Sequence, residues 1–226
     1  MCGIVGVLAA AQSAPPSRER LERAVRALHH RGPDGNGVHV DGPVVLGHTR
    51  LSIIDVDHGA QPIANEDGSI LTVYNGEIWN HVRLRHELER SGHRFRTRCD
   101  TEVLVHGYEE WGDRLPEHLE GMFAFAVWDR SAQRILLARD RVGKKPLYIA
   151  RTTGGVAFGS DARAVMLASG MEPGLERDAV GEFLFQRYVG APRTLFKGIE
   201  RLRPGHRVVY DRHTYDDSPF WELNPV

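Results

Sequence analysis

The apolar segments of this chain come in pairs joined by short turns, and this pairing restricts the folds that the chain can adopt. GMFAFAVWD and RILLARD are separated by residues 130–133, and KPLYIARTTGGVAFGS holds two more apolar runs around Gly154 and Gly155. Such short separations are typical of β-hairpins. Helical patterns lie between groups of hairpins and do not alternate with single strands, as a parallel βαβ fold would require. We therefore expect an α+β fold with two mainly antiparallel sheets packed face to face and helices outside.

The remaining elements are predicted from hydrophobic periodicity and from glycine and proline breaks. Strands are expected at residues 3–8, 42–54 and 69–76, and helices at residues 17–29, 80–91, from about 100 onward, 161–167 and 178–188. Ser17 is the expected N-cap of the first helix. The loop HRGPDGNG holds one proline and three glycines, so no regular structure is expected in it. We assign residues 1–213 to one domain and residues 214–226 to a tail that is a linker or a peripheral strand.

Composition excludes several classes of function. The longest apolar stretches are far shorter than the roughly 20 residues that span a bilayer, so membrane insertion is not expected. The chain has 29 Lys and Arg against 30 Asp and Glu, which leaves no overall field to attract nucleic acid. It has only two cysteines, and its first residues lack the basic segment of a signal peptide. We therefore expect a cytoplasmic protein with free thiols.

The first residues, MCGIVGV, raise the possibility of catalysis by an N-terminal cysteine. Removal of Met1 would leave Cys2 with a thiol and a free α-amine on one carbon. An ordinary cysteine is only a few per cent thiolate at neutral pH, because its pKa is about 8.5. An α-amine titrates near pH 8, so Cys2 would carry its own general base. Position 2 is sometimes a small residue for reasons of expression alone, so this motif needs support from other residues.

Six further motifs follow MCGIVG in order. They are HRGPDG at 30–35, GHTRLSIID at 47–55, YNGEIWNH at 74–81, CDTEVLVHGYEEWG at 99–112, LEGMFAFAVWD at 119–129 and ARDRVGKKPLY at 138–148. Together they closely resemble the glutamine-hydrolysing domain of class II glutamine amidotransferases, and in particular the N-terminal half of asparagine synthetases. The likeness continues through YVGAPRTLFKGIERLRPGHRV to FWEL, and thus covers nearly the whole chain.

The resemblance implies an N-terminal-nucleophile hydrolase fold, a four-layer αββα sandwich, in agreement with the hairpin pattern. It also implies a reaction in which Cys2 attacks the side-chain amide of glutamine, ammonia leaves, and water hydrolyses the γ-glutamyl thioester. The Asn75 side chain and the Gly76 backbone N–H match the family's oxyanion hole. Outside this motif, an Asn-Gly pair would more often be a tight turn after a strand.

Binding of free glutamine requires groups for its α-carboxylate and its α-ammonium. Arg50 and Asp100 match the family positions for these two tasks, and an arginine suits a carboxylate because its planar fork binds both oxygens. Glu77 is a further candidate that contacts the ammonium or orients the loop, and backbone groups near Ile53 are a weaker expectation. The alternatives are that Arg50 is a surface charge at a strand end and that Asp100 is a helix N-cap.

Two other groups of residues suggest no function of their own. Adjacent His29 and His30 would point in different directions on a helix, and neither H-E-x-x-H nor C-x-x-C occurs, so we expect no metal site. Lys144 and Lys145 lack the G-x-x-x-x-G-K-[ST] context of a nucleotide-binding loop and are interpreted as part of a turn. No organic cofactor is expected.

Asparagine synthetases continue into an ATP-using domain with an SGGxDS-like loop, which does not occur before Val226. We interpret the chain as a free-standing subunit that supplies nitrogen to an ATP-dependent synthetase in trans; the alternative is the excised half of a longer enzyme. A homodimer is compatible with the sequence. Two rival functions remain: a related acyl transferase or amidase acting on another γ-glutamyl amide, and a non-catalytic module that senses glutamine or docks to a synthetase.

Overall fold

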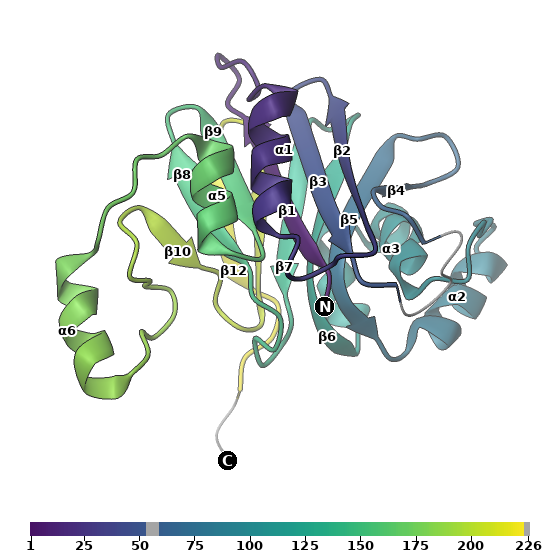
Figure 1. Cartoon of the computed structure of the whole chain (residues 1–226). Helices are drawn as coiled ribbons and strands as arrows, with labels where there is room; N and C mark the ends of the chain where they lie inside the picture. The colour runs from purple at the N-terminus through teal and green to yellow at the C-terminus, as the bar shows by residue number, and fades with distance from the viewer. Residues whose placement is uncertain (53–58, 224–226) are drawn as a thin grey trace.

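Two antiparallel sheets form the centre of the computed structural model, which describes residues 1–52 and 59–223 (Figure 1). In spatial order, the first sheet consists of β10 (Ile199–Arg201), β8 (Tyr148–Thr152), β9 (Gly155–Gly159), β1 (Gly3–Ala9), β3 (Val44–Arg50) and β2 (Gly35–Asp41). The second consists of β12 (Tyr215–Pro219), β11 (His206–Tyr210), β7 (Arg134–Arg139), β6 (Gly121–Asp129), β5 (Ile70–Ile78) and β4 (Ile63–Ala64).

Helices lie outside the two sheets (Figure 1). They are α1 (Arg18–Ala27), α2 (His81–Arg90), α3 (Val103–Trp111), α4 (Leu115–His118), α5 (Ala162–Ser169) and α6 (Arg177–Gln186), with 3₁₀ turns η1 (Asp100–Glu102) and η2 (Gly112–Arg114). α1 and α5 lie side by side over the first sheet, and α2 and α3 belong to the other side of the molecule (Figure 1). The expected α+β fold with four αββα layers is confirmed.

Alternating side chains of the central strands supply the cores between these layers. In β1, Ile4 and Leu8 pack between the two sheets, whereas Val5 and Val7 pack under α1 and α5. In β6, Trp128 faces the other sheet and Phe125 faces the layer of α2 and α3. Because both faces of these strands are buried, their sequences are continuous apolar runs, and this explains why they were recognisable. Within the described residues, no helix is long and apolar enough to cross a bilayer.

The predicted first helix is confirmed, including its cap. The Ser17 hydroxyl accepts a hydrogen bond from the backbone N–H of Arg20 at 3.3 Å, which satisfies one of the donors at the helix N-terminus. Leu21, Val25 and Leu28 are buried on one face, as their spacing predicts.

Some element boundaries differ from the predictions. β2 begins at Gly35, inside the loop that was expected to lack regular structure, and its partly exposed edge position explains its weak apolar pattern. β5 ends at Ile78 and not at Gly76, where the predicted strand ended, because both Gly76 and Ile78 pair with β6. β4, β10 and β11 were not predicted. The tail had two interpretations, a linker or a peripheral strand. Tyr215–Pro219 form a strand that pairs with β11, which is the second of these.

Burial of His48 in β3 gives a pH dependence of stability that can be measured. Desolvation, with a smaller effect from the positive charge of Arg50, lowers the pKa of His48 from 6.5 to about 3. Between these values only the unfolded chain takes up a proton at this residue, so the free energy of unfolding falls as the pH falls. From pH 7 to pH 5 we expect His48 to contribute a loss of about 2 kcal/mol.

Urea unfolding of the wild-type chain and of a His48→Gln variant at both pH values checks this prediction. The variant should lose correspondingly less stability between pH 7 and pH 5, whatever its absolute stability. Glu102, whose folded pKa is lowered to about 2, does not interfere, because it affects stability only below about pH 4.5. An equal loss in both proteins would contradict the assignment.

Candidate active site

A pocket lies where the ends of strands from both sheets meet η1. Cys2 precedes β1, Arg50 ends β3, Asn75 to Glu77 lie in β5, and Asp100 begins η1; all of them line this pocket. The fold thus brings together the predicted site residues that the structure describes. Ile53, the weaker candidate, lies outside the described residues.

The Cys2 thiol is half-buried and is held against the chain that follows β3. The backbone N–H of Leu51 donates to Cys2 Sγ at 3.4 Å, and Sγ lies 3.7 Å from the Leu51 carbonyl oxygen, to which the thiol can donate. Arg31 Nε donates to the Cys2 carbonyl oxygen at 3.1 Å. Met1 also lines the pocket, so its removal would both free the α-amine of Cys2 and enlarge the space beside the thiol.

The HRGPDG loop braces the segment that carries Arg50. A Cβ added at Gly32 would lie 2.6 Å from the backbone of Arg50, so only glycine allows this approach. The backbone N–H of Asp34 donates to the Arg50 carbonyl oxygen at 3.0 Å, and the Asp34 carboxylate accepts from the Ser52 N–H at 2.8 Å. Burial lowers the pKa of the neighbouring Arg31 guanidinium. The sequence alone gives no indication of this positioning role, because it depends on contacts between distant segments.

Asn75 offers a buried hydrogen-bond donor beside the thiol. The residue is only 1% exposed, and its Nδ2 has no hydrogen-bond partner among the described residues. A buried donor of this kind costs free energy unless a ligand satisfies it. Gly76 follows in the same strand, and a Cβ there would lie 2.3 Å from the Met122 carbonyl oxygen on β6. The Asn-Gly pair is therefore a close strand contact that lines a pocket, and not a turn.

Asp100 is fixed by two hydrogen bonds to one of its oxygens. Tyr74 Oη donates to Asp100 Oδ2 at 2.7 Å, and the backbone N–H of Ile78 donates to the same oxygen at 3.0 Å. Burial, reinforced by the Asp100 charge, raises the pKa of Tyr74 well above 10, so Tyr74 remains a donor. The alternative that Asp100 is a helix N-cap is wrong, because Asp100 is already the first residue of η1 and Cys99 precedes it as the cap residue.

The charges in the pocket match a small zwitterion. Arg50 supplies a fixed cation from β3, and Asp100 supplies a carboxylate whose Oδ1 is not used by the two bonds described above. Glu77 adds a second, half-buried carboxylate at the end of β5. A small molecule that carries a carboxylate and an ammonium close together can pair each of them with a group of opposite charge in this pocket.

Several pocket residues were not identified from the sequence. Gln61 Oε1 accepts a hydrogen bond from the Tyr74 N–H at 2.7 Å, which joins the segment before β4 to β5. Lys145 lies in the predicted turn between β7 and β8, yet it is buried and lines the pocket; its N–H donates to Asp140 Oδ2 at 2.9 Å. Cys99 also lines the pocket. Cys99 and Lys145 lie inside the motifs and Gln61 lies between two of them, but no spacing rule assigned any of the three to the pocket.

Comparisons with known proteins identify the family of the chain. A family model described as a glutamine amidotransferase domain matches residues 1–221. Glutamine-hydrolysing asparagine synthetase 3 of Bacillus subtilis is 34% identical over 226 residues, covering 99% of this chain and 37% of that protein. Glutamine-hydrolysing asparagine synthetase 3 of Arabidopsis thaliana is 43% identical over 166 residues, covering 73% of this chain and 28% of that protein. The chain thus spans about a third of the length of these relatives.

A solved structure shows the same fold. Glutamine phosphoribosylpyrophosphate amidotransferase from B. subtilis matches with a TM-score of 0.72 at 19% sequence identity, covering 98% of this chain and 50% of that chain.

Proposed function

This chain belongs to the family of glutamine amidotransferase domains, and from that premise we propose that its pocket hydrolyses the side-chain amide of glutamine with Cys2 as the nucleophile. One observation carries the proposal: a half-buried thiol, a buried amide donor without a partner among the residues that the structure describes, and charges of both signs line one pocket. No metal or organic cofactor is needed for this chemistry, because the nucleophile, the base and the oxyanion donors all come from the chain.

The reaction begins after removal of Met1. The α-amine of Cys2 takes the thiol proton, directly or through one water, and the sulfur attacks the amide carbon of glutamine. Asn75 Nδ2 and the Gly76 N–H stabilise the negative charge on the amide oxygen. The C–N bond breaks, and the nitrogen leaves as ammonia with the proton from the α-amine. Water then attacks the γ-glutamyl thioester, releases glutamate and returns the proton to the sulfur.

The rest of the pocket selects free glutamine. Arg50 pairs with the α-carboxylate and Asp100 with the α-ammonium, while Tyr74 and the Ile78 N–H hold Asp100 Oδ2 in place. Glu77 contacts the same ammonium or orients the loop beside it.

An ATP-dependent synthetase is the partner that we propose for this domain, as a further part of the polypeptide or as a separate subunit. The relatives named above are glutamine-hydrolysing asparagine synthetases and are about three times as long as the matched region. In addition, α6 projects from the sheets (Figure 1) and carries large exposed apolar side chains, Leu184 and Phe185, with Tyr188 just beyond it. Exposed apolar groups that gather in this way are typical of a protein interface.

Release of glutamate from glutamine tests the function, and an Arg50→Ala variant tests the substrate. Losing the charge-assisted pair with the α-carboxylate should raise KM for glutamine at least about 10-fold. The matched control is Arg18→Ala, because Arg18 is an exposed arginine on α1 that does not line the pocket. An unchanged KM, together with equal turnover of γ-glutamyl amides that lack the α-carboxylate, would favour the rival acyl transferase or amidase.

The non-catalytic rival predicts a different mature chain. Retention of Met1 would keep the α-amine of Cys2 in a peptide bond, so a protein that binds glutamine without turnover and keeps Met1 would be a sensing or docking module. Intact-mass spectrometry of the purified protein distinguishes the two cases, and the proposed function requires the mass of the chain without Met1.

A further inference from the structure

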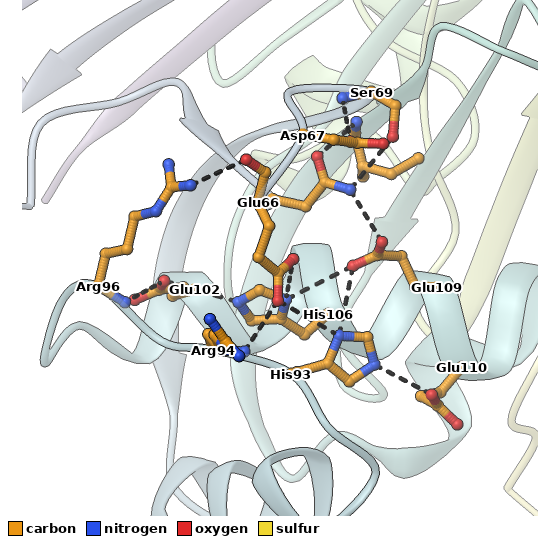
Figure 2. Close-up of polar contacts among 12 residues, drawn as sticks. Glu66, Asp67, Ser69, His93, Arg94, Arg96, Glu102, His106, Glu109 and Glu110 are labelled. Carbon is orange, nitrogen blue, oxygen red and sulfur yellow. Dashed lines mark hydrogen bonds and ion pairs between the residues drawn. The ribbon is translucent and has the colours of Figure 1, made fainter.

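Four ligating side chains from three separate segments converge at a second place in the molecule (Figure 2). We propose that Glu66, His93, His106 and Glu109 bind a divalent transition metal ion of the Zn²⁺ type. Glu66 lies between β4 and β5, His93 follows α2, and His106 and Glu109 share one face of α3 at a spacing of three. None of the four lines the active-site pocket.

The distances between the ligand atoms fit a shared cation better than direct hydrogen bonds. His106 Nδ1 lies 3.4 Å from Glu66 Oε2 and 3.5 Å from Glu109 Oε2. His93 Nδ1 lies 3.6 Å from Glu109 Oε2. Tetrahedral zinc with bonds of 2.0–2.1 Å holds its ligand atoms about 3.3–3.4 Å apart. The ligand atoms all lie within 4.8 Å of one another, so a modest contraction would complete this geometry.

His106 provides an independent indication of a ligand. Its side chain is 1% exposed, and neither of its ring nitrogens has a hydrogen-bond partner among the described residues. Nδ1 lies 3.4 and 3.5 Å from two carboxylate oxygens without a hydrogen bond to either, and a cation between the three atoms would satisfy all of them. Nε2 lies 3.6 Å from Glu102 Oε1, on the opposite side of the ring. A metal ion bound at Nδ1 would satisfy the buried imidazole.

The hydrogen-bond partners of His93, Glu66 and Glu109 leave one ligand atom of each residue available for a metal ion. His93 Nε2 is hydrogen-bonded to Glu110 Oε1 at 3.0 Å, which places the proton on Nε2 and the lone pair on Nδ1. Asn65 Nδ2 donates to Glu109 Oε1 at 2.8 Å, so that Oε2 remains for the metal. The Arg94 N–H donates to Glu66 Oε1 at 2.8 Å, which likewise leaves Oε2. Such outer contacts orient the ligands of metal sites.

The ligand types indicate which metal binds. Two neutral imidazoles and two carboxylates balance the charge of a divalent ion, and the mixture of nitrogen and oxygen donors suits zinc and its neighbours and not calcium or magnesium. Four protein ligands would close a tetrahedral site, so the role is structural. The carboxylates of Glu66 and Glu109 are about one-third exposed, which gives the ion access from solvent.

Metal binding would fix the segment that leads to the active site. It would join the β4–β5 turn to α3, and α3 continues directly from η1, where Asp100 lies. Glu102 already holds this segment, because its carboxylate accepts from the backbone N–H groups of Arg96 and Thr97. We expected no metal site from the sequence, and the proposal departs from that expectation because the ligands come from segments that only the fold brings together.

Zinc titration of the metal-stripped full-length chain, in competition with a chromophoric chelator, tests the proposal. The wild type should bind one equivalent of Zn²⁺, unfold at a higher temperature with zinc, and give the visible absorption of tetrahedral Co²⁺ when cobalt is used. Glu109→Gln and His93→Gln should each weaken zinc binding at least about 100-fold. Glu66→Gln provides a third ligand variant if one of the others fails to fold.

Two controls assign the site. His86→Gln removes an exposed histidine on α2 that is paired with Glu89 and does not belong to the cluster, and it should leave zinc binding unchanged. Cys2→Ala should also leave it unchanged, which excludes the pocket thiol and separates this proposal from the proposed function. Absence of a one-equivalent site, or a site that survives all three ligand substitutions, would overturn the proposal and identify the cluster as an ordinary network of ion pairs.

Discussion

Replacing Cys2 by alanine should reduce the release of glutamate from glutamine at least about 10³-fold, to the background rate. The sulfur forms the covalent intermediate in the proposed reaction, and Cys2 carries both this nucleophile and its base. Alanine is also small, so Met1 should still be removed and the α-amine should still be exposed. A coupled assay for glutamate, on proteins whose intact masses have been verified, measures the effect.

The second thiol of the pocket provides the matched control. Cys99 is buried and lines the same pocket, but it has no α-amine to accept its proton. A diazoketone analogue of glutamine should therefore label the wild type and Cys99→Ala once, at Cys2, and should not label Cys2→Ala. Equal glutaminase rates in the wild type and Cys2→Ala, or a label on Cys99, would reject Cys2 as the nucleophile.

The predictable parts of the fold are the segments whose residue pattern is compatible with only one structural environment, such as a strand buried on both faces. β1, β6 and β7 are buried on both faces, and their uninterrupted apolar runs are readily distinguished from helices by their length and by the turns between them. β2 and β12 are edge strands with exposed and half-buried residues, so their sequences resemble loops. Pairing with a neighbouring strand, which the local sequence does not encode, makes them strands.

The residues of the site could be predicted from the sequence, but their arrangement in space could not. The antiparallel register of β1 and β3 pairs Gly3 with Thr49, and this places Cys2 beside Arg50 although the two lie far apart in the sequence. In β5, Asn75 lies on the same face as Val73, which packs between the two sheets, and Tyr74 lies on the opposite face.

Motifs thus identified which residues matter, whereas their contacts depend on the packed structure. The hydrogen bonds to Asp100 and the cluster around His106 join segments that are distant in the sequence. No local pattern of residues encodes such a contact, so these features follow only from the fold.

Replacing Asn75 by alanine should lower kcat for glutamine about 10²- to 10³-fold and leave KM nearly unchanged. The Asn75 Nδ2 donor is already buried and unpartnered among the described residues, so it requires no rearrangement to meet a developing oxyanion. The neutral amide oxygen of bound glutamine needs this donor less than the charged oxygen of the tetrahedral intermediate does. Removing the donor therefore affects the transition state more than the bound substrate.

Asn80 offers a matched control for this substitution, because both of its side-chain polar groups are used within the protein. Asn80 Nδ2 donates to the His118 carbonyl oxygen at 2.9 Å, and Asn80 Oδ1 accepts from the Glu120 N–H at 3.0 Å. Asn80→Ala should accordingly lower the free energy of unfolding and leave kcat close to that of the wild type. If Asn75→Ala instead raised KM with an unchanged kcat, Asn75 would bind the ground state and the oxyanion would have to be stabilised elsewhere. A kcat that falls equally in both variants would mean that the loss reflects a loosened β5 and not a missing donor.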